Sequence, residues 1–220
     1  MTLIAFARRP LTDLGPVAQL RAGRLARRLT QLLVGLALYG VSIALMVRSR
    51  LGLAPWDVLH SGLARHLPID IGQALILVSA VVMLAWIPLR EVPGIGTVLN
   101  AILIGLSVDA TLAVLPAPES PILRVLFVVG GVALNGLATA AYIGSQLGRG
   151  PRDGLMTGLA RRTGGSLRLV RTLLELSVVV VGLLLGGAIG LGTLLYAVSI
   201  GPLSQAMLPW LTVELTPRRI

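Results

Sequence analysis

The chain has 220 residues, of which 55% are hydrophobic and 13% charged, and its mean hydropathy is +0.88. This composition leaves too little polar surface to cover a soluble globule of that size, so we expect an integral membrane protein whose main partner is the lipid bilayer. The net charge of +10 comes entirely from arginines. No nucleic-acid recognition motif accompanies them, so we expect no nucleic-acid partner and assign the arginines to anionic lipid headgroups beside the spans.

The first 28 residues are basic and lack the pattern of a signal peptide. We expect a cytoplasmic arm in which residues 17–28 form a helix along the membrane surface. Uncharged stretches of spanning length follow over 29–47, 71–89, 92–108, 125–148 and 176–213. Because the last stretch is too long for one helix and has three glycines near its middle, we expect a break near 187–190. The sequence therefore predicts six spans.

A shift of 96 residues superposes the two halves of the chain. It aligns "LGLAPWDVLHSGLARH" (51–66) with "LGRGPRDGLMTGLARR" (147–162) at nine of sixteen positions, and "GIGTVLNAILIG" (94–105) with "GLGTLLYAVSIG" (190–201). Shared apolar composition does not place Pro, Asp and Arg in register, so we infer a duplication. The predicted units are the arm over 1–28, membrane repeat 1 over 29–116, membrane repeat 2 over 121–212 and a cytoplasmic tail over 213–220.

Each repeat has three predicted spans, and an odd number of crossings makes the second copy enter the membrane from the opposite side. With the N-terminus inside, fifteen arginines fall on the cytoplasmic side and four on the other, as the positive-inside rule requires. A rival arrangement of eight spans and parallel repeats gives fourteen against five. In that arrangement residues 54–67 would have to cross, although they reach only about 21 Å of a hydrocarbon core of about 30 Å.

The expected fold is thus an all-α polytopic membrane protein. Its six transmembrane helices form two inverted three-helix repeats, each with a short interfacial or re-entrant helix. We expect it in the bacterial cytoplasmic (inner) membrane, with the N-terminus and the C-terminus in the cytoplasm.

Both copies of the Pro-Asp segment have the pattern of a helix start. Pro55 and Pro151 suit the first helical position, and Asp57 and Asp153 are placed to accept the free amides of the first turn. Two placements stay open: a helix lying on the membrane surface, or a half-helix that dips into the bilayer. In the second case the two helix starts meet near the midplane and line a solute path.

Other residues of the candidate solute site differ between the copies. Trp56 of the first copy is matched by Arg152 in the second, which indicates that the two copies have different roles in the site. Asp109 and its shift partner Gln205 lie in the third spans, where Asp109 is either a polar residue at the end of its span or a solute or proton site. The predicted substrate-binding residues are Pro55, Trp56, Asp57, Pro151, Arg152, Asp153, Asp109 and Gln205.

The doubled Pro-Asp motif and the repeated G-[IL]-G-T resemble those of the YczE group within the YczE/YyaS/YitT bacterial membrane proteins. The resemblance covers roughly residues 28–212, and its most specific element is "LGLAPWDVLHSGLAR". It implies a bacterial membrane protein and names no substrate.

Three functions compete at this point. A small permease or channel for a small-molecule solute fits the inverted duplication, and it is the function we expect. A membrane-embedded accessory or regulatory protein without transport activity fits the few charges within the spans, and it predicts a solid interior. An enzyme would need Asp57, Asp70, His60 and His66 to converge at one leaflet. No catalytic motif and no metal-ligand cluster is visible in the sequence, so we expect no enzymatic activity, no cofactor and no metal; a homo-oligomer stays open.

Overall fold

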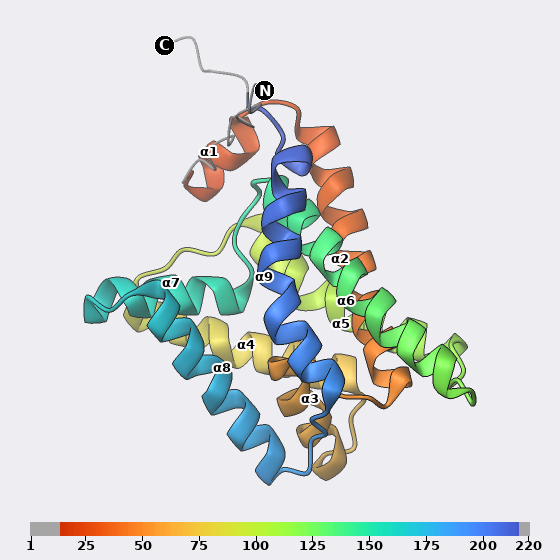
Figure 1. Ribbon diagram of the computed structural model, residues 1–220. Helices are drawn as coiled ribbons and strands as arrows, with labels where there is room; N and C mark the ends of the chain where they lie inside the picture. The colour runs from red at the N-terminus through yellow and green to blue at the C-terminus, as the bar shows by residue number, and fades with distance from the viewer. Residues whose placement is uncertain (1–13, 216–220) are drawn as a thin grey trace, which may run out of the picture.

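The computed structural model describes residues 14–215, which form α-helices and no β-strand. The helices cross one another in a single bundle (Figure 1). Their bounds are α1 (Pro16–Arg21), α2 (Leu25–Ser49), α3 (Pro55–His66), α4 (Ile71–Leu89), α5 (Ile95–Val114), α6 (Pro121–Gly144), α7 (Pro151–Thr163), α8 (Leu167–Leu184) and α9 (Leu191–Leu211). The predicted all-α class is confirmed, while the first half of the predicted arm and the end of the tail lie outside the described residues.

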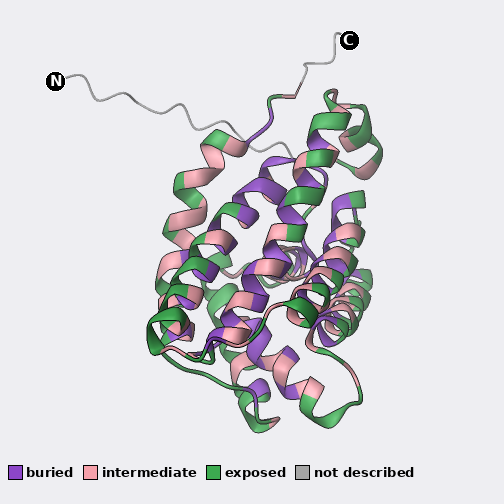
Figure 2. Cartoon of the chain, turned by 90° about the vertical axis from the view of Figure 1, so that its right-hand side faces the viewer, coloured by how far each residue is buried: buried purple, intermediate pink, exposed green. Residues whose placement is uncertain are grey.

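Five helices are long and apolar enough to cross a membrane: α2, α4, α5, α6 and α9. Buried residues gather inside the bundle and exposed residues follow the outer faces of the helices (Figure 2). Many of the exposed side chains are large and apolar, such as Val81, Leu84 and Ile87 on α4. An apolar outer surface of this extent belongs in lipid, so the chain is a multi-pass membrane protein.

The sixth predicted span corresponds to α8, which has 18 residues and carries Arg168, Arg171 and Glu175. These charges keep α8 out of the group of apolar helices, so the sixth span stays a prediction. The predicted break after it is confirmed. The helix ends at Leu184, the chain turns through Gly186 with a φ of 79°, and α9 begins at Leu191.

The prediction of one surface helix over 17–28 is wrong. Helix α1 ends at Arg21, and the chain then turns through Gly23, whose φ is 82°. Helix α2 begins at Leu25, so Arg28 lies within it, and this side chain is fully buried. The glycine interrupts the helix, and the basic segment divides between the surface and the interior.

Each helix from α2 to α5 has a counterpart 96 residues later in α6 to α9, with bounds that agree within one residue. The packing of the helices follows the same correspondence. Helix α2 packs on α6 in the centre, α2 also packs on α5, and α6 on α9. Each Pro-Asp helix packs on a helix of the other half: α3 packs on α8, and α7 packs on α4.

The repeated sequence motifs contact each other across the two halves. The backbone N–H of Gly96 donates to the Leu147 carbonyl at 2.8 Å, and the N–H of Gly192 donates to the Leu51 carbonyl at 2.8 Å. The two hydrogen bonds are equivalent, because exchanging the two halves turns one into the other, as at a two-fold interface. The "LG" before each Pro-Asp helix therefore anchors the start of the third long helix of the other half.

The halves differ in the packing of their last two long helices. Helix α4 packs along α5, and a Cβ on Gly105 would lie 2.4 Å from the Gly72 carbonyl oxygen. The counterparts α8 and α9 are not packed along each other. A Cβ on Gly201, the counterpart of Gly105, would meet no atom within 4 Å. The bundle is thus closed between α4 and α5 and separated between α8 and α9.

Candidate functional site

The two Pro-Asp helices begin around a pair of adjoining cavities in the centre of the bundle. The smaller cavity, of about 40 Å³, is lined by Tyr39, Asp57, His60, Asn100, Ile104 and Pro151 among others. The larger cavity, of about 200 Å³, is lined by Pro55, Thr139, Asp153, Tyr196, Ile200 and Gln205 among others. Trp56, Tyr142 and Arg152 line both.

The two cavities are counterparts under the shift of 96 residues. Asn100 and Ile104 line the smaller cavity, and their partners Tyr196 and Ile200 line the larger one. The larger cavity extends between α8 and α9, where the bundle is separated, and the smaller one lies where α4 packs along α5. The difference in volume therefore follows from the difference in helix packing.

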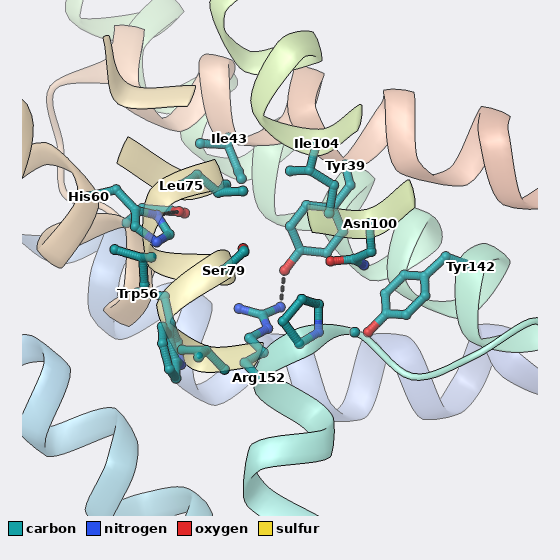
Figure 3. Close-up of a pocket in the computed structure, with 15 residues that line it drawn as sticks. Tyr39, Ile43, Trp56, His60, Leu75, Ser79, Asn100, Ile104, Tyr142 and Arg152 are labelled. Atoms are coloured by element: carbon teal, nitrogen blue, oxygen red, sulfur yellow. Dashed lines mark hydrogen bonds and ion pairs between the residues drawn. The ribbon is translucent and has the colours of Figure 1, made fainter. Parts of the chain in front are cut away.

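Arg152 lines both cavities, and in the smaller one its guanidinium points toward the Tyr39 hydroxyl (Figure 3). Its Nη2 donates a hydrogen bond to the Tyr39 hydroxyl, and its Cζ lies 5.5 Å from the centre of the Tyr39 ring. The hydrogen bond and this contact hold the guanidinium beside the Tyr39 hydroxyl. The ring of Tyr142 packs edge-on to that of Tyr39, with centroids 6.2 Å apart.

The predicted capping role of the two aspartates is wrong. The Asp57 Oδ1 lies 3.1 Å from the His60 Nδ1, one turn later on the same face of α3. Asp153 accepts a hydrogen bond from the Tyr142 hydroxyl. Within the described residues neither Pro-Asp helix has a side-chain cap. Each carboxylate lines a cavity and has a side-chain partner there instead of a backbone amide.

Seven of the eight predicted site residues line one or both cavities, and Asp109 lines neither. The Asp109 Oδ1 accepts a hydrogen bond from the Gly72 N–H at 2.7 Å. It therefore satisfies one of the free amides at the start of α4. The four residues of the enzyme hypothesis do not converge either, since Asp70 caps α4 and His66 is exposed at the end of α3.

The sequence comparisons place the chain among bacterial relatives. A family of unknown function, DUF6198, matches residues 26–209. The chain belongs to this family. It is 45% identical to an uncharacterized protein of Haemophilus influenzae, over 80% of this chain and 81% of that protein. It is 33% identical to the "Uncharacterized membrane protein YczE" of Bacillus subtilis, over 84% of this chain and 87% of that protein.

The "Uncharacterized protein YyaS" of Bacillus subtilis is 28% identical to the chain, over 80% of the chain and 90% of that protein. The predicted resemblance to the YczE group is thereby confirmed. No solved structure matches the chain.

Sequence reasoning missed three polar residues that line the larger cavity of this DUF6198 protein: Thr139, Tyr142 and Ser204. The hydroxyls of Thr139 and Ser204 are buried without a hydrogen-bond partner in the described residues. A hydroxyl in an apolar helix ordinarily bonds to its own backbone, so nothing in the sequence singles out these two residues. Tyr142 corresponds to Met46 in the other half, and the repeat therefore did not mark it.

Proposed function

We propose that this DUF6198 protein is a small permease or channel built from two inverted repeats of three spans. The observation that carries the proposal is the pair of central cavities, lined by counterpart residues of the two halves and joined at Trp56 and Arg152. A half-helix that starts within the bilayer is tolerated where its first turn faces protein or water. The starts of α3 and α7 meet this condition because both face the cavities.

The sixth span of the proposal is α8. Its exposed apolar side chains form a stripe at helical spacing, consisting of Leu169, Leu173, Leu176, Val180 and Leu184. A stripe of this kind fits lipid along the length of the helix. The charged residues of α8 lie in its first half, nearest the side that the arginine distribution assigns to the cytoplasm.

The proposal identifies the side of the membrane from which the larger cavity is reached. The helices α8 and α9 are apart, and the larger cavity between them includes Arg171 and Leu208 from the proposed cytoplasmic ends of these helices. The matching route between α4 and α5 is closed by the contact of Gly72 with Gly105. A solute would thus reach Arg152 from the cytoplasmic side in this conformation. The accessory-protein alternative predicted a solid interior, which the cavities do not favour.

The test fills the larger cavity without disturbing the fold. Gly201 lines that cavity, and a Cβ there would meet no atom within 4 Å, so Gly201→Phe adds a ring into open space. Gly130→Phe is the matched control, because it is equally unobstructed but exposed on the outer face of α6. Liposomes carrying each protein are challenged with polyols, amino acids and ammonium salts of organic acids, and their swelling is followed by light scattering.

We expect at least one solute to swell wild-type and Gly130→Phe liposomes faster than protein-free liposomes. The Gly201→Phe liposomes should swell at the protein-free rate with that solute. Equal swelling of wild-type and Gly201→Phe liposomes would contradict a path through this cavity. Swelling at the protein-free rate with every solute would contradict the permease.

A further inference from the structure

The larger cavity collects polar groups that lack partners. The Nε1 of Trp56 is buried without an acceptor, and the hydroxyls of Thr139 and Ser204 are buried without any partner in the described residues. All three residues line the larger cavity. Trp56 is only 6% exposed, and an indole N–H is solely a donor. A buried donor without an acceptor is costly, so this cavity is built for a ligand that brings acceptors.

The guanidinium of Arg152 is the second donor group of the cavity. Among the described residues, no carboxylate lies within 4.0 Å of it, and the Tyr39 hydroxyl is its hydrogen-bond partner. A guanidinium has five N–H donors. Most of the hydrogen-bonding capacity of Arg152 is therefore open toward the cavities that it lines.

The carboxylates near the cavity are engaged by other groups. Asp153 accepts from the Tyr142 hydroxyl, and Glu175 pairs with Arg171 at 2.9 Å. Asp57 lies beside His60 in the smaller cavity. Asp153 also acts on Arg152 through its charge, without a direct ion pair. The groups at the junction that lack an acceptor or an ion-paired carboxylate are thus donors, one of them positively charged.

We propose that Arg152 and Trp56 form the binding site for the carboxylate group of a small organic solute. A planar guanidinium held in place by a tyrosine hydroxyl matches the two oxygens and the single charge of a carboxylate. Chloride offers one atom and only its charge, and phosphate brings additional charge that one guanidinium leaves uncompensated. The hydroxyls of Thr139 and Ser204 face the remainder of the solute in the larger cavity. This inference rests on the proposed function, because it treats the cavities as a solute path.

Binding is tested on the purified full-length protein in detergent. The melting temperature is followed while lactate, butyrate or alanine is added, each against its amide, with sodium chloride and sodium phosphate as inorganic anions. We expect at least one carboxylate to raise the melting temperature, and its amide and the inorganic anions to do so far less. The alanine arm shows whether an ammonium group beside the carboxylate is accepted.

Variants locate the site. Arg152→Gln should weaken binding of the active carboxylate by about 100-fold, Arg152→Lys by about 10-fold because the charge stays and the fork is lost, and Trp56→Phe by about 10-fold. The control is Arg162→Gln on the same helix, an exposed arginine outside both cavities, which should bind like the wild type. Melting temperatures without ligand show whether each variant is folded. If Arg152→Gln does not fold, Trp56→Phe tests the site instead, because it keeps most of the aromatic ring and removes the N–H donor.

Three results would overturn the inference. They are amides that bind as tightly as their carboxylates, chloride or phosphate binding at the same site with equal effect, and no response to any of the carboxylates. Flux is measured separately in the liposomes described above. Flux of neutral solutes through a protein that binds no carboxylate overturns the carboxylate site and leaves the permease, whereas carboxylate binding without any flux overturns the permease and leaves the site.

Discussion

At the scale of single residues, Arg28 shows how a charge is accommodated inside an apolar bundle. Its guanidinium donates to the carbonyl oxygens of Ser145 at 2.8 Å, Gln146 at 2.6 Å and Gln19 at 2.6 Å. Two of these carbonyls follow the end of α6, where backbone acceptors have no partner within the helix. The side chain thus ties the start of α2 to the end of α6.

Replacing this side chain removes donors from three carbonyl oxygens, one on the buried Ser145 and two on the half-buried Gln19 and Gln146. We expect Arg28→Ala to lower the stability by about 2 to 4 kcal/mol, since unpaired buried polar groups each cost about 1 to 3 kcal/mol. Arg27→Ala is the matched control, because Arg27 is exposed one position earlier on the same helix, and it should change stability by less than about 0.5 kcal/mol. Thermal unfolding in detergent compares the two. Similar melting temperatures for both variants would show that the buried contacts contribute little.

The sequence did not reveal this role of Arg28. Six arginines in the first 28 residues predict headgroup contacts, and nothing local distinguishes Arg28 from its neighbours. Its partners Ser145 and Gln146 lie 117 and 118 residues away. The capping prediction for Asp153 failed in the same way, because its partner Tyr142 comes from another helix, whereas the partner of Asp57, His60, lies one turn later on the same helix.

At the scale of helices, the contact between the halves depends on the glycine before each Pro-Asp helix. Gly52 has a φ of 121°, which disfavours any side chain, and a Cβ there would lie 2.6 Å from the Gly190 nitrogen. Gly148 occupies the same position in the other half, with a φ of 134°. Backbone conformation and close approach both select glycine at these sites.

Because of this contact, we expect a side chain at residue 52 to lower the stability by more than backbone strain alone would. We expect Gly52→Ala to cost about 2 to 4 kcal/mol, because the strain at positive φ adds to a clash with the start of α9. Gly164→Ala is the control for strain, since Gly164 has a φ of 67° but a Cβ there would meet no atom within 4 Å. It should cost about 1 to 2 kcal/mol. Equal losses of melting temperature in the two variants would contradict the contribution of the clash.

The sequence predicted the helices and their ends more accurately than the contacts between the helices. Proline at the start of α3, α6 and α7 and the glycine-rich break after α8 give local signals for where helices begin and end. The repeat shows that the halves correspond. It does not show that the "LG" of one half meets the "G-x-G-T" of the other, because a pairing across a pseudo-symmetry axis leaves no spacing signal in the chain.

At the scale of the whole molecule, the two halves are counterparts that differ in openness. The separation of α8 from α9 was not predicted, because aligned sequences carry no record of which helix pair is apart. Cavity residues were predicted where the repeat diverges in chemistry, as at Trp56 and Arg152, and missed where a lone hydroxyl stood in an apolar run, as at Thr139. Divergence at matching positions was informative only within the Pro-Asp motif, because Tyr142, which matches Met46, was missed.

The inverted arrangement predicts opposite exposure of two matching positions. Leu67 follows α3 and Thr163 ends α7, the two lie 96 residues apart, and both are exposed. The sequence contains no cysteine, so Leu67→Cys and Thr163→Cys each introduce a single thiol for an impermeant maleimide. Three spans between these positions place them on opposite sides, and the arginine distribution places Thr163 inside. We expect Leu67→Cys to be labelled in intact cells and Thr163→Cys only after permeabilisation.

The same experiment separates the two arrangements that the sequence left open. Parallel repeats require an even number of crossings between the two thiols, so labelling of both from the same side would contradict the inverted fold. The meeting of α3 and α7 would then need another explanation, because helices that enter from one side do not approach the midplane from opposite faces. Labelling from opposite sides would instead place the two ends of the central cavities on the two faces of the membrane, which is the geometry that passage of a solute past Arg152 requires.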